Sequence, residues 1–585
     1  MNRLSRARPV VACVGLACCL TFFSGRLVQL HVTKHETYVN LAAKKNLKKE
    51  SIFAMRGAIK DVKGEVLAVS EPLRTIIADA SRITDPKKTA LALADLLELD
   101  AAELEAKISD RSKRYIVLKK QVREVVCQAL DQRIGEQRLR GISSEPDARR
   151  IYPNGPMLCH VLGFVNYEHR GMQGIEMTME RYLQGRDGFR VIEKSRSGHE
   201  IVPYRRQERM AQDGFNIRLT VDMAIQGFVE TELNAACEQY KPEMATVIVM
   251  DPKTGRILAM ANRPHFDPNE PGEGSDASKI NAAVISQVEP GSTFKIVTVA
   301  ASLNEKLVTP DTIINLEGGR FHFAGRVLRD HGHGPFPNRS VHDLLVKSSN
   351  IGVAKLAMMM GERRFYEYIR SFGFGERSGI NLPGEIAGIV HPPRWSKIAI
   401  SRIPMGQGVA TTPLQMVIAM SAIANGGKLM MPQIVREVCD EEGNTVVDFK
   451  PVVVREVVEP EVTDLVKAAL RDVVSPRGTA RRAIVPGFTV GGKTGTAQKP
   501  SPKGGYYDHR YVSSFIGFMP AEDPKLVCLV LFDDAKVPTN ENYGGVLAAP
   551  VFSRIAEKTA RYWNLQPDPA LLEGGGMKLT QTSER

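Results

Sequence analysis

One apolar segment near the N-terminus decides where the rest of the chain can fold. The sequence PVVACVGLACCLTFFSG, residues 9–25, holds no charged side chain, and further aliphatic residues follow Arg26. The long arginine side chain can reach the membrane surface, so the span approaches the ~20 apolar residues that a bilayer requires. We predict an uncleaved transmembrane anchor at residues 9–30 rather than a cleaved signal peptide, because Arg26, Gln29 and His31 make a poor cleavage region.

The charges that flank this segment predict its orientation. Arg3, Arg6 and Arg8 precede it, and basic residues favour the cytoplasmic side of a membrane. We therefore expect residues 1–8 to form a cytoplasmic tail and the chain beyond the anchor to lie outside the cytoplasm. A polar, basic and helical stalk is expected at residues 31–50.

The remaining sequence is long enough for more than one hydrophobic core. A length of 585 residues predicts two or three domains, and 43% hydrophobic with 25% charged residues is typical of folded globular proteins. The net charge of +12 suits a surface facing anionic lipid or an anionic wall polymer, whereas a nucleic-acid-binding arm has weak support. The eight cysteines show no C-x-x-C spacing, and we interpret the histidine cluster at 331–333 as a loop, so no metal site is predicted.

Apolar periodicity divides the outer part of the chain into two folded regions. The first, residues 51–210, opens with two short strands around a turn at Lys63 and Gly64 and continues with a helical stretch at 87–107. Residues 205–214 are polar and basic, and we interpret them as a linker. The second region covers residues 215–563, and a disordered tail is predicted at 564–585.

The second region reads as a sheet interrupted by helices. A strand leads to a helix whose N-cap is Asp222, and a hairpin follows over residues 246–260. Helical patterns dominate residues 292–425. Strands then return, and a helix closes the region; the expected ranges are 488–490, 512–518, 526–532 and 549–562. This order predicts an α+β fold in which an antiparallel sheet carries an inserted helical block.

The stretch EPGSTFKIVTVA, residues 289–300, carries the clearest chemical signal. The apolar run after Pro290 and Gly291 predicts a buried helix, with Ser292 at or near its N-terminus and Lys295 over the same face. Desolvation and the positive end of the helix dipole both lower a lysine pKa, so Lys295 is a plausible base for a Ser292 nucleophile. The alternative is a serine that only caps the helix and a lysine that reaches to solvent.

Two further short motifs lie far away in the sequence. Residues 348–350 read Ser-Ser-Asn at a turn that enters a helix, and residues 493–496 read Lys-Thr-Gly-Thr after a strand predicted to end at residue 492. Each motif has a second match elsewhere in the sequence. The Ser-x-Asn at 302–304 lies on the nucleophile helix itself, and the Lys-Thr-Gly at 253–255 fills the tip of a hairpin, where such residues are common turn formers.

Taken in order, these motifs resemble the signature set of penicillin-binding proteins and serine β-lactamases. Residues 405–408, Met-Gly-Gln-Gly, are similar to a further stretch of the family's transpeptidase domain. Upstream, the RGAIKD stretch at 56–61, YPNG at 152–155 and GIE at 174–176 resemble the pedestal of class B members, and residues 56–80 look most like the septal type. The resemblance implies that residues 51–210 form the class B pedestal (dimerisation) domain and residues 215–563 the transpeptidase domain.

The resemblance also implies a mechanism and a set of site residues. Ser292 would attack the carbonyl between the two terminal D-alanines of a peptidoglycan stem peptide, and an amine of a neighbouring peptide would resolve the ester. No cofactor or metal is implied. The implied catalytic residues are Ser292, Lys295, Ser348, Asn350 and Lys493, and the implied substrate-binding residues are Thr494, Gly495 and Thr496.

Several alternatives stay open at the level of sequence. They are an elongation-type class B transpeptidase, a D,D-carboxypeptidase or β-lactamase, and a non-catalytic septal scaffold or β-lactam sensor. The expected partners are peptidoglycan stem peptides, β-lactams, the membrane and division proteins including a membrane glycosyltransferase, with no nucleic acid. The expected location is the bacterial inner membrane, with a single span, a cytoplasmic N-terminus and a periplasmic catalytic domain.

Overall fold

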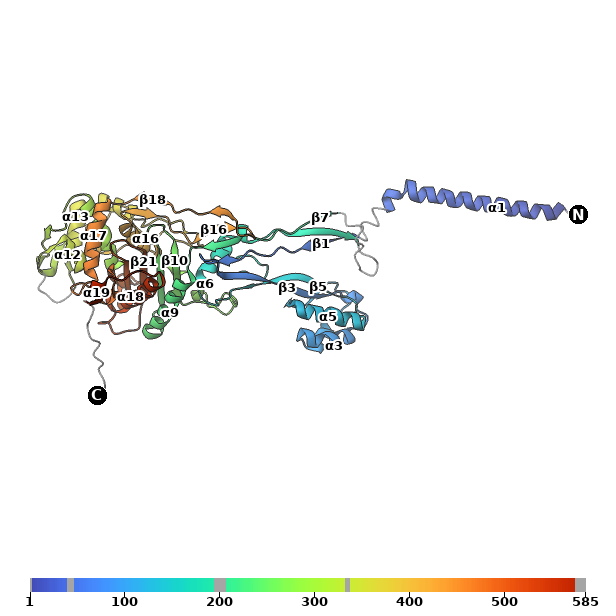
Figure 1. The fold of residues 1–585 in the computed structure, drawn as a ribbon, viewed down its shortest axis with the longest axis horizontal. Helices are drawn as coiled ribbons and strands as arrows, with labels where there is room; N and C mark the ends of the chain where they lie inside the picture. The colour runs from blue at the N-terminus through green and yellow to red at the C-terminus, as the bar shows by residue number, and fades with distance from the viewer. Residues whose placement is uncertain (1–2, 39–46, 194–206, 332–336, 574–585) are drawn as a thin grey trace, which may run out of the picture. The chain divides into compact units, whose positions relative to one another are not determined.

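The computed structural model describes residues 3–38, 47–193, 207–331 and 337–573 and divides them into two compact units, each taken by itself below (Figure 1). Parts of several sequence predictions lie outside the described residues. These parts are the first two residues of the tail, the middle of the stalk (39–46), the start of the linker, His333 and the end of the C-terminal tail.

The smaller unit comprises residues Met1–Met55, Pro72–Ala148 and Gly185–Asp213. Helix α1 (Arg3–Val28) leads into a π-helical turn, η1 (Gln29–Thr33). Within the described part of the chain, Pro9–Thr33 is the one helix long and apolar enough to cross a membrane. Strands β1 (Leu47–Ile52), β6 (Gly188–Glu193) and β7 (Gln207–Arg209) form an antiparallel sheet. The predictions of a helical stalk to residue 50 and a linker from 205 are wrong here, because pairing between distant segments overrides local propensity.

The rest of the smaller unit is a sheet with three helices. The later part of β3 (Val66–Ala78) pairs with β4 (Ile116–Val122) and β5 (Ile142–Ile151). Apolar side chains of these strands and of α3 (Pro86–Leu97), α4 (Ala101–Ile108) and α5 (Glu124–Gln137) form one core. The single helix predicted at 87–107 is two helices. Glu98 ends the first in a left-handed conformation, and the Asp100 carboxylate caps the second.

The larger unit contains a five-stranded antiparallel sheet in the order β10-β9-β21-β20-β19. The strands are β9 (Met244–Met250), β10 (Ile257–Arg263), β19 (Gly491–Pro500), β20 (Tyr506–Met519) and β21 (Leu526–Asp533). The β9–β10 hairpin is the one the sequence predicted. Among the strands that the structure describes, β19 pairs with β20 alone, so it forms an edge of this sheet.

Helices cover both faces of this sheet. Phe515 packs its ring against Phe552 of α18 (Gly544–Tyr562), which in turn packs on α9 (Met223–Tyr240). Its neighbour Ile516 points to the opposite face. There it lies with Phe294 and with Met416, which belongs to α16 (Pro413–Ala424). Asp222 caps α9 by accepting from Ala224 N, as predicted. The labels α9, α16 and α18 mark these helices in Figure 1.

The segment between β10 and β19 forms the helical block that the sequence predicted. Its helices enclose the buried α11, and short two-stranded ladders connect some of them. The main helices are α11 (Lys295–Asn304), α12 (Val341–Val346), α13 (Asn350–Met360), α14 (Glu362–Ser371), α15 (Ala399–Arg402) and α17 (Pro460–Val473). The ladders are β11 (Ile313–Ile314) with β14 (Arg339–Ser340), β12 (Arg320–Phe323) with β13 (Arg326–Arg329), and β15 (Lys428–Met430) with β18 (Val453–Glu456).

Part of the predicted pedestal belongs to the larger unit, because Arg56–Glu71 and Arg149–Gln184 cluster with the C-terminal residues. There β2 (Ile59–Lys60) lies between the start of β3 and β8 (Asn216–Leu219), and β16 (Val435–Cys439) and β17 (Thr445–Asp448) extend the sheet. Glu176 on α7 (Gly174–Thr178) is fully buried and accepts from Arg56 Nε at 2.6 Å and Arg150 Nε at 2.7 Å. The sequence segments at 56–61 and 174–176 thus meet in one buried ion network.

Three further element boundaries differ from the sequence predictions. The strand expected at 488–490 begins instead at Gly491, so the Lys-Thr-Gly motif lies inside β19 rather than after a strand. Helix α18 begins at Gly544, five residues before the expected start, and contains Pro550. The tail expected to be disordered from 564 includes a short helix, α19 (Pro569–Glu573), and Asp568 N donates to Gly487 O at 2.8 Å.

Candidate active site

Ser292 lies in a tight turn that precedes the buried helix. The turn is a 3₁₀ segment, η5 (Gly291–Phe294), which continues directly into α11. Gly291 has a φ of 54°, and a Cβ at Gly406 would lie 2.2 Å from Gly291 O, so glycines are required on both sides of this contact. Ser292 itself is half-buried and does not cap the helix. The interpretation of Ser292 as only a capping residue is therefore wrong.

Lys295 is fully buried and points to the second motif. Its Nζ donates to Ser348 O at 2.6 Å, to Ser348 Oγ at 3.1 Å and to Asn350 Oδ1 at 2.7 Å. Among the described residues, no hydrogen bond joins Lys295 Nζ to Ser292 Oγ. The lysine is therefore held by the Ser-Ser-Asn turn, and its reach to solvent, the other part of the alternative interpretation, is wrong.

The Ser-Ser-Asn turn is fixed by a carboxylate that sequence reasoning missed. Asp330 accepts from Asn350 N at 2.6 Å, from Ile351 N at 3.0 Å and from Ser349 Oγ at 2.7 Å. These donors lie at the N-terminus of α13, where an anion is favoured. Ser348 has a φ of 57°, which non-glycine residues seldom adopt, and this conformation turns the chain into the helix. Nothing local in the sequence connects Asp330 to a helix that begins twenty residues later.

The Lys-Thr-Gly-Thr motif lies on the edge strand β19, beside the nucleophile turn. Lys493 is fully buried, and its Nζ donates to Ser348 Oγ at 3.0 Å and to Thr494 O at 3.2 Å. A Cβ at Gly495 would lie 2.4 Å from Ser514 Oγ and 3.1 Å from Thr293 Cγ2, so only glycine fits between the sheet and the turn. Thr496 Oγ1 accepts from Gly544 N at 3.3 Å, which ties β19 to the start of α18.

The two buried lysines have strongly altered proton affinities. Burial lowers the pKa of Lys295 well below its usual 10.5; the nearby charge of Lys493 lowers it further, and Asp330 opposes the shift. Burial alone lowers the pKa of Lys493 to about 7. Both ammonium nitrogens meet at one hydroxyl, Ser348 Oγ. Such an arrangement can pass a proton between a nucleophile and a leaving group at neutral pH.

An open cleft of about 720 Å³ gives access to these groups. Its lining includes Ser292, Ser348, Thr494 and Thr496, so it joins all three motifs. It also includes His331 and residues around the start of α18, which the sequence did not predict as site residues. Burial lowers the pKa of His331, and the charge of Lys295 lowers it further. The predicted interpretation of this histidine as part of an ordinary loop is incomplete.

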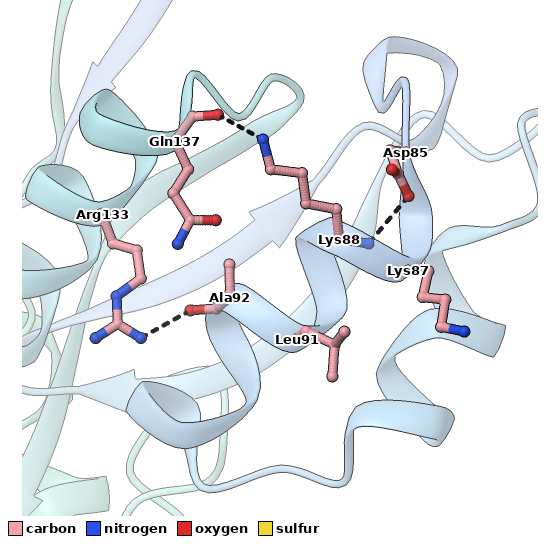
Figure 2. Close-up of a pocket in the computed structure, with 7 residues that line it drawn as sticks. All are labelled: Asp85, Lys87, Lys88, Leu91, Ala92, Arg133 and Gln137. Atoms are coloured by element: carbon pink, nitrogen blue, oxygen red, sulfur yellow. Dashed lines mark hydrogen bonds between the residues drawn. The ribbon is translucent and has the colours of Figure 1, made fainter.

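Another pocket, in the smaller unit, offers no comparable chemistry. It lies between α3 and α5 and encloses about 440 Å³ (Figure 2). Lys88 Nζ donates to Gln137 O at 3.2 Å, and Arg133 donates to Ala92 O at 3.2 Å and to the Asp95 carboxylate. Since two of its three cations already have acceptors, we assign this pocket no function.

Comparisons with known proteins agree with the order of the motifs. The family model "Penicillin binding protein transpeptidase domain" matches residues 245–557, and "Penicillin-binding Protein dimerisation domain" matches residues 51–219.

Relatives resemble the chain over most of its length. Stage V sporulation protein D of Bacillus subtilis is 34% identical over 523 residues, which cover 88% of this chain and 79% of that protein. Peptidoglycan D,D-transpeptidase FtsI of Escherichia coli K12 is 30% identical over 564 residues, which cover 95% of this chain and 91% of that protein. The structure of penicillin-binding protein 3 from Mycobacterium tuberculosis, complexed with ampicillin, has a TM-score of 0.69 and 28% identity, covering 89% of this chain and 98% of that one.

Proposed function

The chain belongs to the class B penicillin-binding proteins, and we propose that it cross-links septal peptidoglycan through an acyl-ester on Ser292. It is a serine-type peptidoglycan D,D-transpeptidase and a single-pass membrane protein. The residues that carry the reaction, the septal role, the partners and the membrane topology are the proposed parts.

One observation carries the assignment of the catalytic residues. Two buried lysines share the Ser348 hydroxyl at 3.1 and 3.0 Å, in a cleft that also contains Ser292. A serine can be activated without a histidine when a buried, uncharged amine lies beside it. Asn350 supports the role of Lys295 by accepting from its Nζ.

In the proposed acylation step, Ser292 Oγ attacks the carbonyl carbon between the two terminal D-alanines. Its proton passes to Lys295, the ester forms, and the C–N bond breaks. The departing D-alanine amine takes a proton through Ser348. Backbone N–H groups of Ser292 and Thr496 would hold the developing oxyanion, and such a donor contributes roughly 3–4 kcal/mol in serine hydrolases. In the second step an amine of another stem peptide attacks the ester, loses its proton and frees Ser292.

The terminal carboxylate of the substrate is assigned to the β19 edge. Thr494 and Thr496 are half-buried on this strand and line the cleft, and Gly495 lets the strand approach the nucleophile turn. Lys493 lies beneath them and supplies positive potential. Because an approaching carboxylate favours the charged form, substrate binding would raise the pKa of Lys493 from about 7 and keep the lysine protonated.

The site assignment is tested by mapping the residue that a fluorescent penicillin acylates in the full chain. We expect the label on Ser292, no label on Ser292→Ala, and normal labelling of Ser302→Ala, which changes another serine of the same helical segment. Acylation at a different residue would overturn the assignment. The lifetime of the ester separates a transpeptidase from a β-lactamase or D,D-carboxypeptidase, since rapid turnover would favour the hydrolytic enzymes.

The septal role rests on residues 56–80, which resemble division-type members. Complementation separates the possibilities. The gene should restore division to cells depleted of their septal transpeptidase, and Ser292→Ala should not. Rescue of elongation-defective cells instead would assign it to the elongation type, and full rescue by Ser292→Ala would make the protein a scaffold or sensor. The proposed partners are division proteins, including a membrane glycosyltransferase, and the N-terminus is assigned to the cytoplasm.

A further inference from the structure

A second pocket adjoins the acylation cleft of the larger unit. It encloses about 440 Å³, and Gln407 lines both it and the cleft that contains Ser292. Part of its wall is the chain from α15 to Gly408, which packs directly on the nucleophile turn. Gly291 N donates to Gly406 O at 3.3 Å, and Gly408 N donates to the Glu289 carboxylate at 2.8 Å. The pocket therefore adjoins the cleft at Gln407, and none of its lining residues belongs to β19.

The charge of this pocket is positive and unbalanced. Arg394 and Arg402 line it, and none of its lining residues is acidic. Arg402 is half-buried, and it makes no ion pair or side-chain hydrogen bond with any residue that the structure describes. Burial lowers the pKa of Arg402, Tyr506 opposes that shift, and the charge of Arg326 lowers the pKa further, so a third guanidinium lies near. An unpaired, partly desolvated guanidinium is costly unless an anion binds it.

Glu289, just before the nucleophile turn, does not pair with Arg402 among the described residues. Its carboxylate accepts from Tyr506 Oη at 3.1 Å and from Gly408 N. Trp395 lines the same pocket as the arginines and supplies a rigid apolar surface. Its Nε1 donates to His391 O at 3.0 Å, and its ring meets Phe365 edge to face. The pocket thus combines an arginine that lacks an anion with an aromatic surface, a combination suited to a peptide that ends in a carboxylate.

We propose that this pocket, the arginine pocket, binds the C-terminal carboxylate of the acceptor stem peptide, with Arg402 as its main anchor. This inference rests on the proposed transpeptidase function. A cross-link joins two copies of one polymer, so the acceptor peptide ends in a carboxylate as the donor does. The donor occupies the β19 side of Ser292, and the acceptor amine must approach the ester from elsewhere. The arginine pocket supplies that approach and discriminates an acceptor peptide from water.

The test separates the two half-reactions in the full-length protein, purified in detergent. A short thioester of an N-acylated D-alanine forms the acyl-enzyme, which carries no free carboxylate of its own. A synthetic stem peptide with a side-chain amine then competes with water for the ester, and it is supplied with a free C-terminal carboxylate or as the C-terminal amide. The measured quantity is the ratio of aminolysis to hydrolysis at a subsaturating peptide concentration.

We expect amidation of the acceptor to lower this ratio about tenfold in the unchanged protein, the usual effect of losing a charge-assisted contact. Arg402→Gln should lower the ratio of aminolysis to hydrolysis about tenfold with the free-acid acceptor. With the amide acceptor, the variant and the unchanged protein should give the same ratio. Arg402→Lys should retain part of the ratio. Lys397→Gln changes an exposed lysine of the same segment that lies outside the pocket, and it should behave as the unchanged protein.

Three results would overturn the proposal. Equal ratios for the acid and the amide acceptor in the unchanged protein would show that the carboxylate is not recognised. An equal loss of penicillin acylation and aminolysis in Arg402→Gln would mean that Arg402 only supports the nucleophile turn. Slower acylation by a full-length donor peptide, but not by the short thioester, would assign the pocket to the donor. Failure of the unchanged protein to be acylated by penicillin would instead refute the proposed function.

Discussion

Replacing Lys493 with methionine should stabilise the protein while it damages the active site. The Lys493 side chain is fully buried, and burial lowers its pKa from 10.5 to about 7. The unfolded chain holds the proton up to about pH 10, whereas the folded chain releases it near pH 7. Between these values the unfolded state binds more protons, so the free energy of unfolding rises with pH.

The size of the effect follows from the two pKa values. At about 1.4 kcal/mol per pH unit, burying this lysine costs the native state about 4 kcal/mol at pH 7 and about 2 kcal/mol at pH 9. Methionine removes that cost but leaves Thr494 O without its donor, a loss of about 1–2 kcal/mol. We therefore expect Lys493→Met to raise the free energy of unfolding by about 2 kcal/mol at pH 7. Near pH 9 the variant and the unchanged protein should have equal free energies of unfolding. Relief of the Lys295 pKa, which Lys493 lowers, acts in the same direction.

Urea unfolding followed by tryptophan fluorescence measures this difference. The chain has two tryptophans, Trp395 and Trp563, and both lie in the same unit as Lys493. Lys503→Met, which changes an exposed lysine, is the control and should alter stability by less than about 0.5 kcal/mol. A less stable Lys493→Met protein at pH 7, or a gap that does not narrow toward pH 9, would refute the reasoning. Penicillin acylation should fall in the same variant.

Three further substitutions test other parts of the site and its support. Asp330→Ala removes the acceptor of Asn350 N and should slow penicillin acylation at least about tenfold; because Asp330 raises the pKa of Lys295, the acid limb of the pH profile should move to lower pH. An unmoved limb would contradict this coupling. Gly495→Ala should cost about 1–3 kcal/mol in urea unfolding, since its Cβ would meet Ser514 Oγ, and native stability would refute that contact. Glu176→Gln removes the anion that buried Arg150 shares with Arg56, whereas Arg56 keeps its pair with Glu180; the change should cost about 3–5 kcal/mol by tryptophan fluorescence, a loss that an unchanged midpoint would exclude.

The parts of the fold that sequence could predict are those with strong local periodicity. The apolar anchor, the β9–β10 hairpin and the helical block have patterns that depend only on neighbouring residues. The extent of β19 could not be predicted in this way. Gly491, Gly492 and Gly495 have low strand propensity, and close contacts with Phe518, Phe515 and Ser514 require glycine at these positions. The early start of α18 was hidden by its two glycines and by Pro550.

The candidate site divides in the same way. Three separate motifs could be recognised because each is a short run of fixed residue types, and the structure brings their lysines and serines to one cleft. Asp330 and Arg402 could not be found, since each acts through a contact that only the folded chain creates. An aspartate before a histidine, or an arginine at the end of a short helix, carries no local signal of its role.

The proton affinity of one buried lysine depends on the charge of the other. The sequence suggested desolvation and the helix N-terminus as causes of the shift in the Lys295 pKa; in the structure burial is the largest cause and the Lys493 charge the next. Because burial lowers the pKa of Lys493 to about 7, its charge and its effect on Lys295 depend on what occupies the cleft. A substrate carboxylate that holds Lys493 in its charged form thereby favours the neutral form of Lys295, the form that can accept a proton from Ser292. In the proposed mechanism Lys295 is thus most available as a base when the correct substrate is bound, and water in an empty cleft gains no such activation.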